Sequence, residues 1–165
     1  MGADGAWTAW LPGLGAEVAP LQASNCGFDV ARVEEGATLL PGWSEYFSSR
    51  FAGHALKTVA LSVRRGAGSD FQQRGEFVIT QGGVEGSLVY AAAAALRTLI
   101  ASQGRAVAHL DLLAGRDVES VRAEVVRPRG SRSLATHLKS RLRLDGVKAA
   151  LSHELLRRPL PEAIC

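Results

Sequence analysis

The sequence has few cysteines and no long uncharged hydrophobic run. Among 165 residues only Cys26 and Cys165 carry thiols, and neither belongs to a C-x-x-C pair. This cysteine usage is typical of a reducing compartment. The most apolar stretch, residues 88–100, is interrupted by Arg97 and is far too short to span a membrane. The N-terminus also lacks the basic and apolar regions of a secretory leader. We therefore expect a cytoplasmic protein with no membrane partner.

Aromatic residues are also scarce, and the segment from Val121 to Cys165 has none. The net charge of +3 is small, but residues 121–158 hold ten basic and three acidic side chains. Arg129 and Arg132, near an expected helix start, have the chemistry to clamp a phosphate. The alternative is a solvated surface, or one that meets an acidic protein. Because no aromatic ring is present for bases to stack on, nucleic-acid binding is disfavoured.

The remaining composition, 47% apolar and 21% charged, is that of an ordinary globular chain. Such a length can bury one core, but it cannot hold a nucleotide-binding domain, a substrate domain and a cap together.

Hydrophobic periodicity predicts an α+β fold that is rich in strands up to Leu113 and helical beyond, with a boundary near Ala114. A loop is expected over residues 36–42 and a turn over 81–87. We expect β-structure at residues 16–33, 56–63, 75–80 and 106–113, and helices at 4–11 (with Asp4 as N-cap and Pro12 as stop), 43–51, 88–102, 118–126, 131–142 and 147–156.

The glycine-rich turn Gly82-Gly83-x-x-Gly86-Ser87 follows a predicted strand and precedes the longest predicted helix. Free backbone N–H groups at such a helix start can hold a phosphate or carboxylate. The alternative is a tight turn that needs glycine for its backbone angles. The spacing matches neither G-x-G-x-x-G nor a P-loop. A serine hydrolase is also disfavoured, because the nucleophile elbow would need glycine where Val89 stands.

His109 and Asp111 are expected on one face of a strand. That placement permits an acid–base pair or part of a metal site, although two ligands are too few for zinc. A partly buried strand histidine is the simpler interpretation. We expect no catalytic and no metal-ligating residue in this chain.

A series of short motifs in a fixed order resembles the bacterial NAD(P)/FAD-dependent flavoproteins that are called aminoacetone-oxidase-like. The motifs span nearly the whole chain, and they are residues 4–7 (DGAW), 18–21 (VAPL), 25–28 (NCGF), 43–47 (WSEYF), 74–80 (RGEFVIT), 83–91 (GVEGSLVYA), 110–113 (LDLL), 127–134 (RPRGSRSL) and 146–149 (GVKA).

The resemblance implies an insert domain within a discontinuous FAD domain, with the G-x-G-x-x-G turn before Met1 and the closing flavin segment after Cys165. The insert would combine a β-barrel-like portion, containing one long helix, with a small all-helical portion. It also implies four segments: residues 1–20, a remnant of the flavin-binding domain; 21–113, the β-rich insert portion; 114–156, the helical insert portion; and 157–165, the return segment.

Site and partner expectations follow from the same resemblance. Gly2, Asp4 and Gly5 would lie near the FAD of the full-length protein, and the turn with Glu85 would face the flavin cavity. The partner would be the flavin-binding domain of the same protein. This chain alone would bind no FAD and would be an inactive part of an oxidoreductase. The alternative is a stand-alone module whose basic C-terminal helices bind nucleic acid or an acidic protein.

Overall fold

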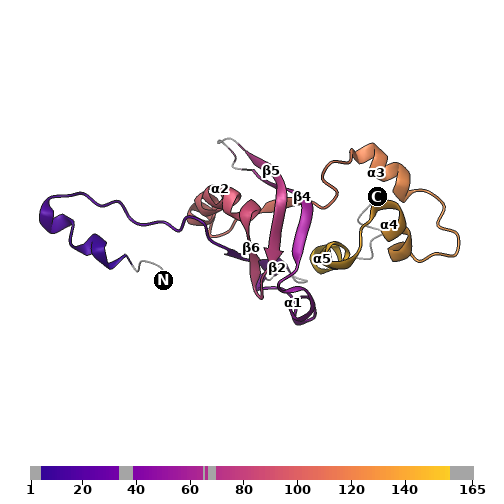
Figure 1. Ribbon diagram of the computed structural model, residues 1–165, viewed down its shortest axis with the longest axis horizontal. Helices are drawn as coiled ribbons and strands as arrows, with labels where there is room; N and C mark the ends of the chain where they lie inside the picture. Colours follow the sequence, from indigo (N-terminus) through magenta and orange to yellow (C-terminus); the bar gives the residue numbers. More distant parts are fainter. Residues whose placement is uncertain (1–4, 34–38, 65, 67–69, 157–165) are drawn as a thin grey trace.

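The computed structural model describes residues 5–33, 39–64, 66 and 70–156, which form a protruding arm, a central sheet and a helical end (Figure 1). The arm, residues 5–27, extends away from the sheet. It contains two short 3₁₀ helices, η1 (Ala6–Ala9) and η2 (Pro12–Leu14).

The sheet has five strands in the order β1-β6-β5-β4-β7, and every neighbouring pair is antiparallel. It curls into a half-barrel, and β2 pairs with β3 in a separate two-stranded ladder. This architecture confirms the predicted α+β class with a barrel-like portion. The strands are β1 (Phe28–Asp29), β2 (Ala31–Val33), β3 (Leu39–Pro41), β4 (Ala55–Val63), β5 (Phe71–Ile79), β6 (Gly83–Glu85) and β7 (Ala108–Asp111).

The β4–β5 hairpin is the longest ladder. Val59, Leu61 and Val63 alternate with smaller residues along β4, whereas β5 buries only Phe77 and Ile79 near its end. The register of the hairpin shifts between Leu56 and Val59, where Thr58 adopts a φ of 54°. Such a bulge bends and twists a strand, so it contributes to the curl of the sheet.

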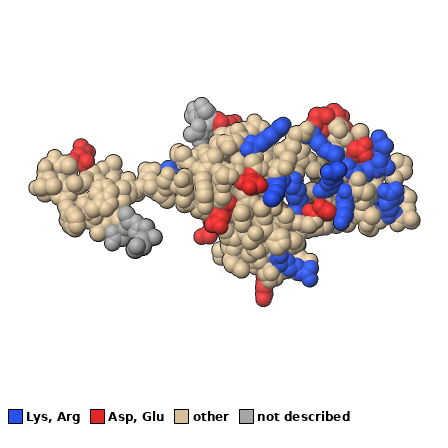
Figure 2. Space-filling view, viewed as in Figure 1, with Lys and Arg blue, Asp and Glu red and all other residues tan. Residues whose placement is uncertain are grey.

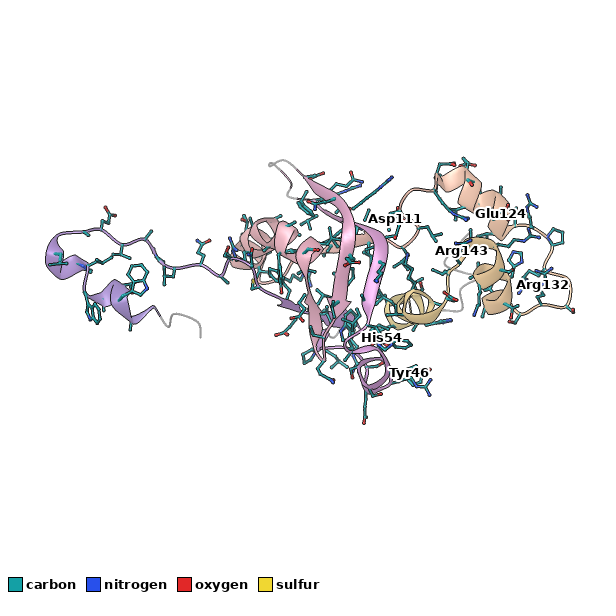
Figure 3. All side chains as sticks on the ribbon, viewed as in Figure 1. Tyr46, His54, Asp111, Glu124, Arg132 and Arg143 are labelled. Carbon is teal, nitrogen blue, oxygen red and sulfur yellow. The ribbon has the colours of Figure 1, made fainter. Side chains whose placement is uncertain are left out.

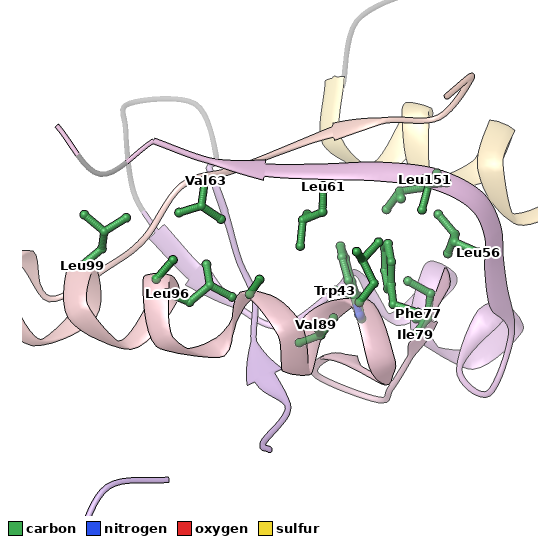
Figure 4. Packing of buried hydrophobic residues seen from close by; sticks show 14 of the residues in the cluster. Trp43, Leu56, Leu61, Val63, Phe77, Ile79, Val89, Leu96, Leu99 and Leu151 are labelled. Atoms are coloured by element: carbon green, nitrogen blue, oxygen red, sulfur yellow. The ribbon is translucent and has the colours of Figure 1, made fainter. Parts of the chain in front are cut away.

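Helix α2 (Ser87–Gln103) covers one face of the sheet and supplies much of the core (Figure 4). Leu96 and Leu99 pack with Val63 and other strand residues, and the C-cap Gly104 ends the helix with a φ of 73°. The buried residues of α2 are Leu88, Val89, Ala92, Ala93, Ala95, Leu96 and Leu99.

Four further helices are α1 (Glu45–Phe51), α3 (Val118–Val125), α4 (Leu134–Leu142) and α5 (Gly146–Leu156). Leu138 and Leu142 of α4 form a small second core with residues of α3, whereas Leu151 of α5 belongs to the main core. Helix α5 thus connects the helical end to the sheet. Within the described ranges, no helix is both long and apolar enough to cross a membrane.

The predicted elements at residues 43–51, 56–63, 75–80, 88–102, 106–113, 118–126 and 147–156 are confirmed within a few residues. Residues 16–27 contain no strand, because that extended segment has no pairing partner among the described residues. The expected loop at 36–42 is wrong in part: Leu39–Pro41 pairs with β2, and residues 36–38 lie outside the described residues.

Two helix starts and one turn also differ from the prediction. The first helix is a pair of 3₁₀ segments, and Pro12 begins the second, since proline is well tolerated at a first helical position. Helix α4 starts at Leu134, three residues after the predicted start, because the Ser133 hydroxyl caps it by accepting the N–H of Thr136. Within the expected turn 81–87, residues 83–85 form β6 between β1 and β5.

Candidate functional site

The glycine-rich turn before α2 is tightly bonded to its surroundings. The Gly83 N–H donates to Thr80 Oγ1 at 2.9 Å, and the Gly83 carbonyl accepts from Trp43 Nε1 at 3.0 Å. A Cβ at Gly83 would overlap the Phe28 carbonyl oxygen of β1. Gly86 has a φ of 109°, which disfavours any L side chain. These contacts support the structural interpretation of the glycines.

The proposed anion site at the start of α2 stays a prediction. Gly86 provides no side-chain cap, and the Ser87 hydroxyl donates to the Glu76 carbonyl at 3.5 Å. Glu85 lies exposed on β6 opposite Val78, so its side chain is accessible to a partner or a ligand. The expected position of Glu85 in a flavin cavity stays a prediction.

His109 and Asp111 lie exposed on β7, opposite Ser62 and Ala60 of β4. Asp111 Oδ1 accepts the N–H of Leu113 at 2.8 Å, which fixes the carboxylate against its own chain. In the described part of the chain, no group of three His, Cys, Asp or Glu residues could hold a metal ion. The strand position is as predicted, and the arrangement favours a structural Asp111.

A polar junction that the sequence did not reveal joins α5 to the sheet. It lies near Asp111, which Figure 3 labels on the sheet side of the helical end. Lys148 Nζ donates to the Leu112 carbonyl at 2.7 Å and to the Thr58 carbonyl at 3.2 Å. Burial lowers the pKa of the Lys148 amine from its ordinary value, and the Asp111 carboxylate partly opposes this shift. The only sequence signal was the Gly146-Val147-Lys148-Ala149 motif, which gave no partner.

A second unpredicted junction joins α5 to the start of α1. Glu154 of α5 accepts the Ser44 N–H at 2.5 Å with Oε1 and the Ser44 hydroxyl at 2.7 Å with Oε2. Ser44 in turn caps α1 by accepting the Phe47 N–H at 3.1 Å. One carboxylate therefore satisfies the start of α1 and orients the last turn of α5.

His137 anchors α4 to α3 and carries no sign of catalysis. It is buried, and Nε2 lies 3.1 Å from the Glu124 carbonyl and 3.2 Å from the Val125 carbonyl. Since both neighbours only accept, Nε2 carries the proton. The Nδ1 atom is buried without a hydrogen-bond partner among the described residues.

Figure 2 shows Lys and Arg side chains gathered over the helical end on the visible face of the molecule. Part of this charge is neutralised, because Glu124 pairs with Arg127 at 3.2 Å and with Arg141 at 3.6 Å. Arg132 bonds only weakly, at 3.5 Å, to the Ser140 hydroxyl. The Arg132 N–H donates to the Arg129 carbonyl at 3.3 Å, so one turn holds the two residues. Their action as a phosphate clamp stays a prediction.

Among the expected cofactor-binding residues, Gly5 lies in the described arm. Gly2 and Asp4 lie outside the described residues, whereas Gly5 precedes η1 with a φ of 76°. A Cβ on Gly5 would lie 3.0 Å from Leu21, so η1 folds back on the arm. Trp10 remains 72% exposed and Leu14 80% exposed.

The fold and these junctions set the context for comparison with known proteins. The family model described as "HI0933-like protein barrel and H2TH domain" matches residues 37–158. The chain belongs to the HI0933-like family. Its description names the two parts observed here, a barrel-like sheet and a helical region. The HI0933-like proteins are FAD-dependent flavoproteins. No match was found among curated proteins or among solved structures.

Proposed function

We propose that this HI0933-like domain is the substrate-side insert of a FAD-dependent oxidoreductase, and that it binds no FAD and catalyses no redox reaction by itself. Family membership over residues 37–158 supports the flavoenzyme context. In this role the domain would cover the isoalloxazine ring and exclude water, while a separate domain holds the cofactor.

The strand pairing is the observation that carries the proposal. The doubly wound dinucleotide-binding fold has parallel strands joined by helices, with the pyrophosphate at a glycine-rich turn. Every strand pair in the described residues is antiparallel. Gly83 allows the close approach of β1, and Gly86 allows the backbone angle at the start of α2. The described residues therefore do not fit an FAD site of this kind.

The arm supports a flavin-binding domain of the same protein as the partner. Its exposed Trp7, Trp10 and Leu14 would be covered by such a domain. In that assembly Gly2, Asp4 and Gly5 would lie near the flavin, and the turn with Glu85 would line the substrate cavity. The proposal also includes NAD(P)H as the electron donor and an aminoacetone-oxidase-like reaction. It further includes a chain that is one piece of a longer protein and a cytoplasmic location.

Flavin retention by the purified chain tests the proposal directly. We expect that FAD added in excess separates fully from the protein on gel filtration, and that FAD fluorescence is unchanged by titration with the chain. Stoichiometric retention of yellow flavin would overturn the proposal. Sequencing the flanking DNA is an independent check, because a G-x-G-x-x-G-encoding stretch should lie upstream.

A further inference from the structure

A groove of about 770 Å³ separates the base of the arm from the C-terminal half of α2. Ala23, Cys26 and Phe28 line it on the arm side, and Arg97, Ile100 and Ala101 on the helix side. Small-molecule sites typically measure roughly 300–1,000 Å³ and combine an apolar lining with few polar groups. The groove has this size and this character.

Arg97 is the single charged residue that lines the groove. Its Nη1 donates to the carbonyl of Ala23, and also to that of Ser24 at 3.3 Å. Its Nε is buried without a hydrogen-bond partner, and no carboxylate forms an ion pair with Arg97 within the described ranges. The two carbonyls fix the guanidinium but carry no net charge. A half-buried cation of this kind favours an anionic group nearby.

The rest of the lining favours an apolar molecule. Phe28 and Ile100 line the groove, and Ile100 is 39% exposed, outside the buried face of α2. Ala101 adds a small apolar side chain to the lining. From this combination we propose that the groove binds an apolar molecule that carries one anionic group, with the anion on Arg97 and the body against Phe28, Ile100 and Ala101. The site does not depend on the proposed role in a flavoenzyme.

Two dyes that share an aromatic body test the charge requirement. 1-Anilinonaphthalene-8-sulfonate carries one sulfonate, and N-phenyl-1-naphthylamine is its uncharged counterpart. In fluorescence titrations of the full chain, Arg97→Gln should weaken sulfonate-dye binding about tenfold, the loss of one charge-assisted contact. Binding of the neutral dye should change less than about twofold. Glutamine keeps a donor for the carbonyls, and Arg105→Gln, an exposed arginine just beyond α2, is the matched control.

A second variant locates the dye. Ala101→Phe fills the groove without changing its charge, so it should weaken both dyes, while circular dichroism confirms that the fold is intact. Unchanged sulfonate-dye affinity in either Arg97→Gln or Ala101→Phe would overturn the proposal. An equal loss of both dyes in Arg97→Gln would overturn it as well, because the arginine would then shape the groove rather than bind an anion.

Discussion

At the scale of single residues, Lys148 and Thr58 show how the sheet and the helical end are joined. Thr58 is β-branched, yet its φ of 54° lies in the left-handed region, where such residues are strained. The carbonyl of this residue accepts from Lys148, as does the carbonyl of Leu112. Sequence patterns could not predict this junction, because it unites three residues that are far apart in the chain. Lys148 therefore stabilises the bulge at Thr58, which contributes to the curl of the sheet.

Lys148→Met tests this function. The substitution keeps the aliphatic stem but leaves two carbonyl groups without their donor, so the free energy of unfolding should fall by about 1–3 kcal/mol. Urea unfolding followed by circular dichroism measures the change. Lys139→Met is the control, because Lys139 is exposed and pairs only with Asp145 at 3.4 Å. Equal losses in the two variants would contradict the assignment.

The wild type and Lys148→Met also test a prediction about the pH dependence of stability. Burial lowers the pKa of Lys148 in the folded state. At pH values between the pKa of Lys148 in the folded chain and its ordinary pKa in the unfolded chain, the unfolded chain binds more protons at this residue. The free energy of unfolding therefore rises with pH in this range. The stability of the wild type minus that of Lys148→Met should therefore increase as pH rises toward the ordinary lysine pKa. A constant or falling difference would show that burial does not control the titration.

At the scale of elements, length decided what the sequence could predict. Strand β4 and the 17-residue helix α2 are long enough to show a pattern. Strand β5 was predicted only from residue 75, because the preceding residues 72–74 are all polar. The strands β1, β2, β3 and β6 have two or three residues each, too few for any pattern. Strand β6 was further hidden among glycines that are typical of turns. Candidate residues fared likewise: the strand position of His109 was predictable, but the contacts of Glu154 and Arg97 were not.

Gly83 and Gly82 form a matched pair for testing the close contact between the paired strands β1 and β6. Gly83→Ala places a methyl group on the Phe28 carbonyl, so β1 must move and stability should fall by about 1–3 kcal/mol or more. Gly82→Ala meets only the Asp29 carboxylate at 3.7 Å, an ordinary contact, and should change stability by less than about 1 kcal/mol. Thermal unfolding of both variants measures this difference. Similar losses would indicate that backbone freedom, rather than this close contact, explains both glycines.

At the scale of the whole molecule, the arm is the part that contributes no residue to either hydrophobic core. The main cluster joins the sheet, α2, α1 and α5, and a second cluster joins α3 and α4. None of the buried core residues belongs to arm residues 5–27. The arm contacts the body through the carbonyls of Ala23 and Ser24, which bind Arg97 of α2. Its apolar side chains are thus available to a partner domain or to a second copy.

The isolated chain should therefore self-associate through the arm. Trp10 and Leu14 are 72% and 80% exposed, and burying side chains of this size contributes roughly 1.5–3 kcal/mol each. Sedimentation equilibrium should show an average mass that rises with concentration. Trp10→Ser should shift the association to higher concentration, whereas Leu155→Ser, at a 55% exposed residue of α5, should not. A monomer at all concentrations, or an equal effect of both variants, would mean that the chain does not self-associate through the arm.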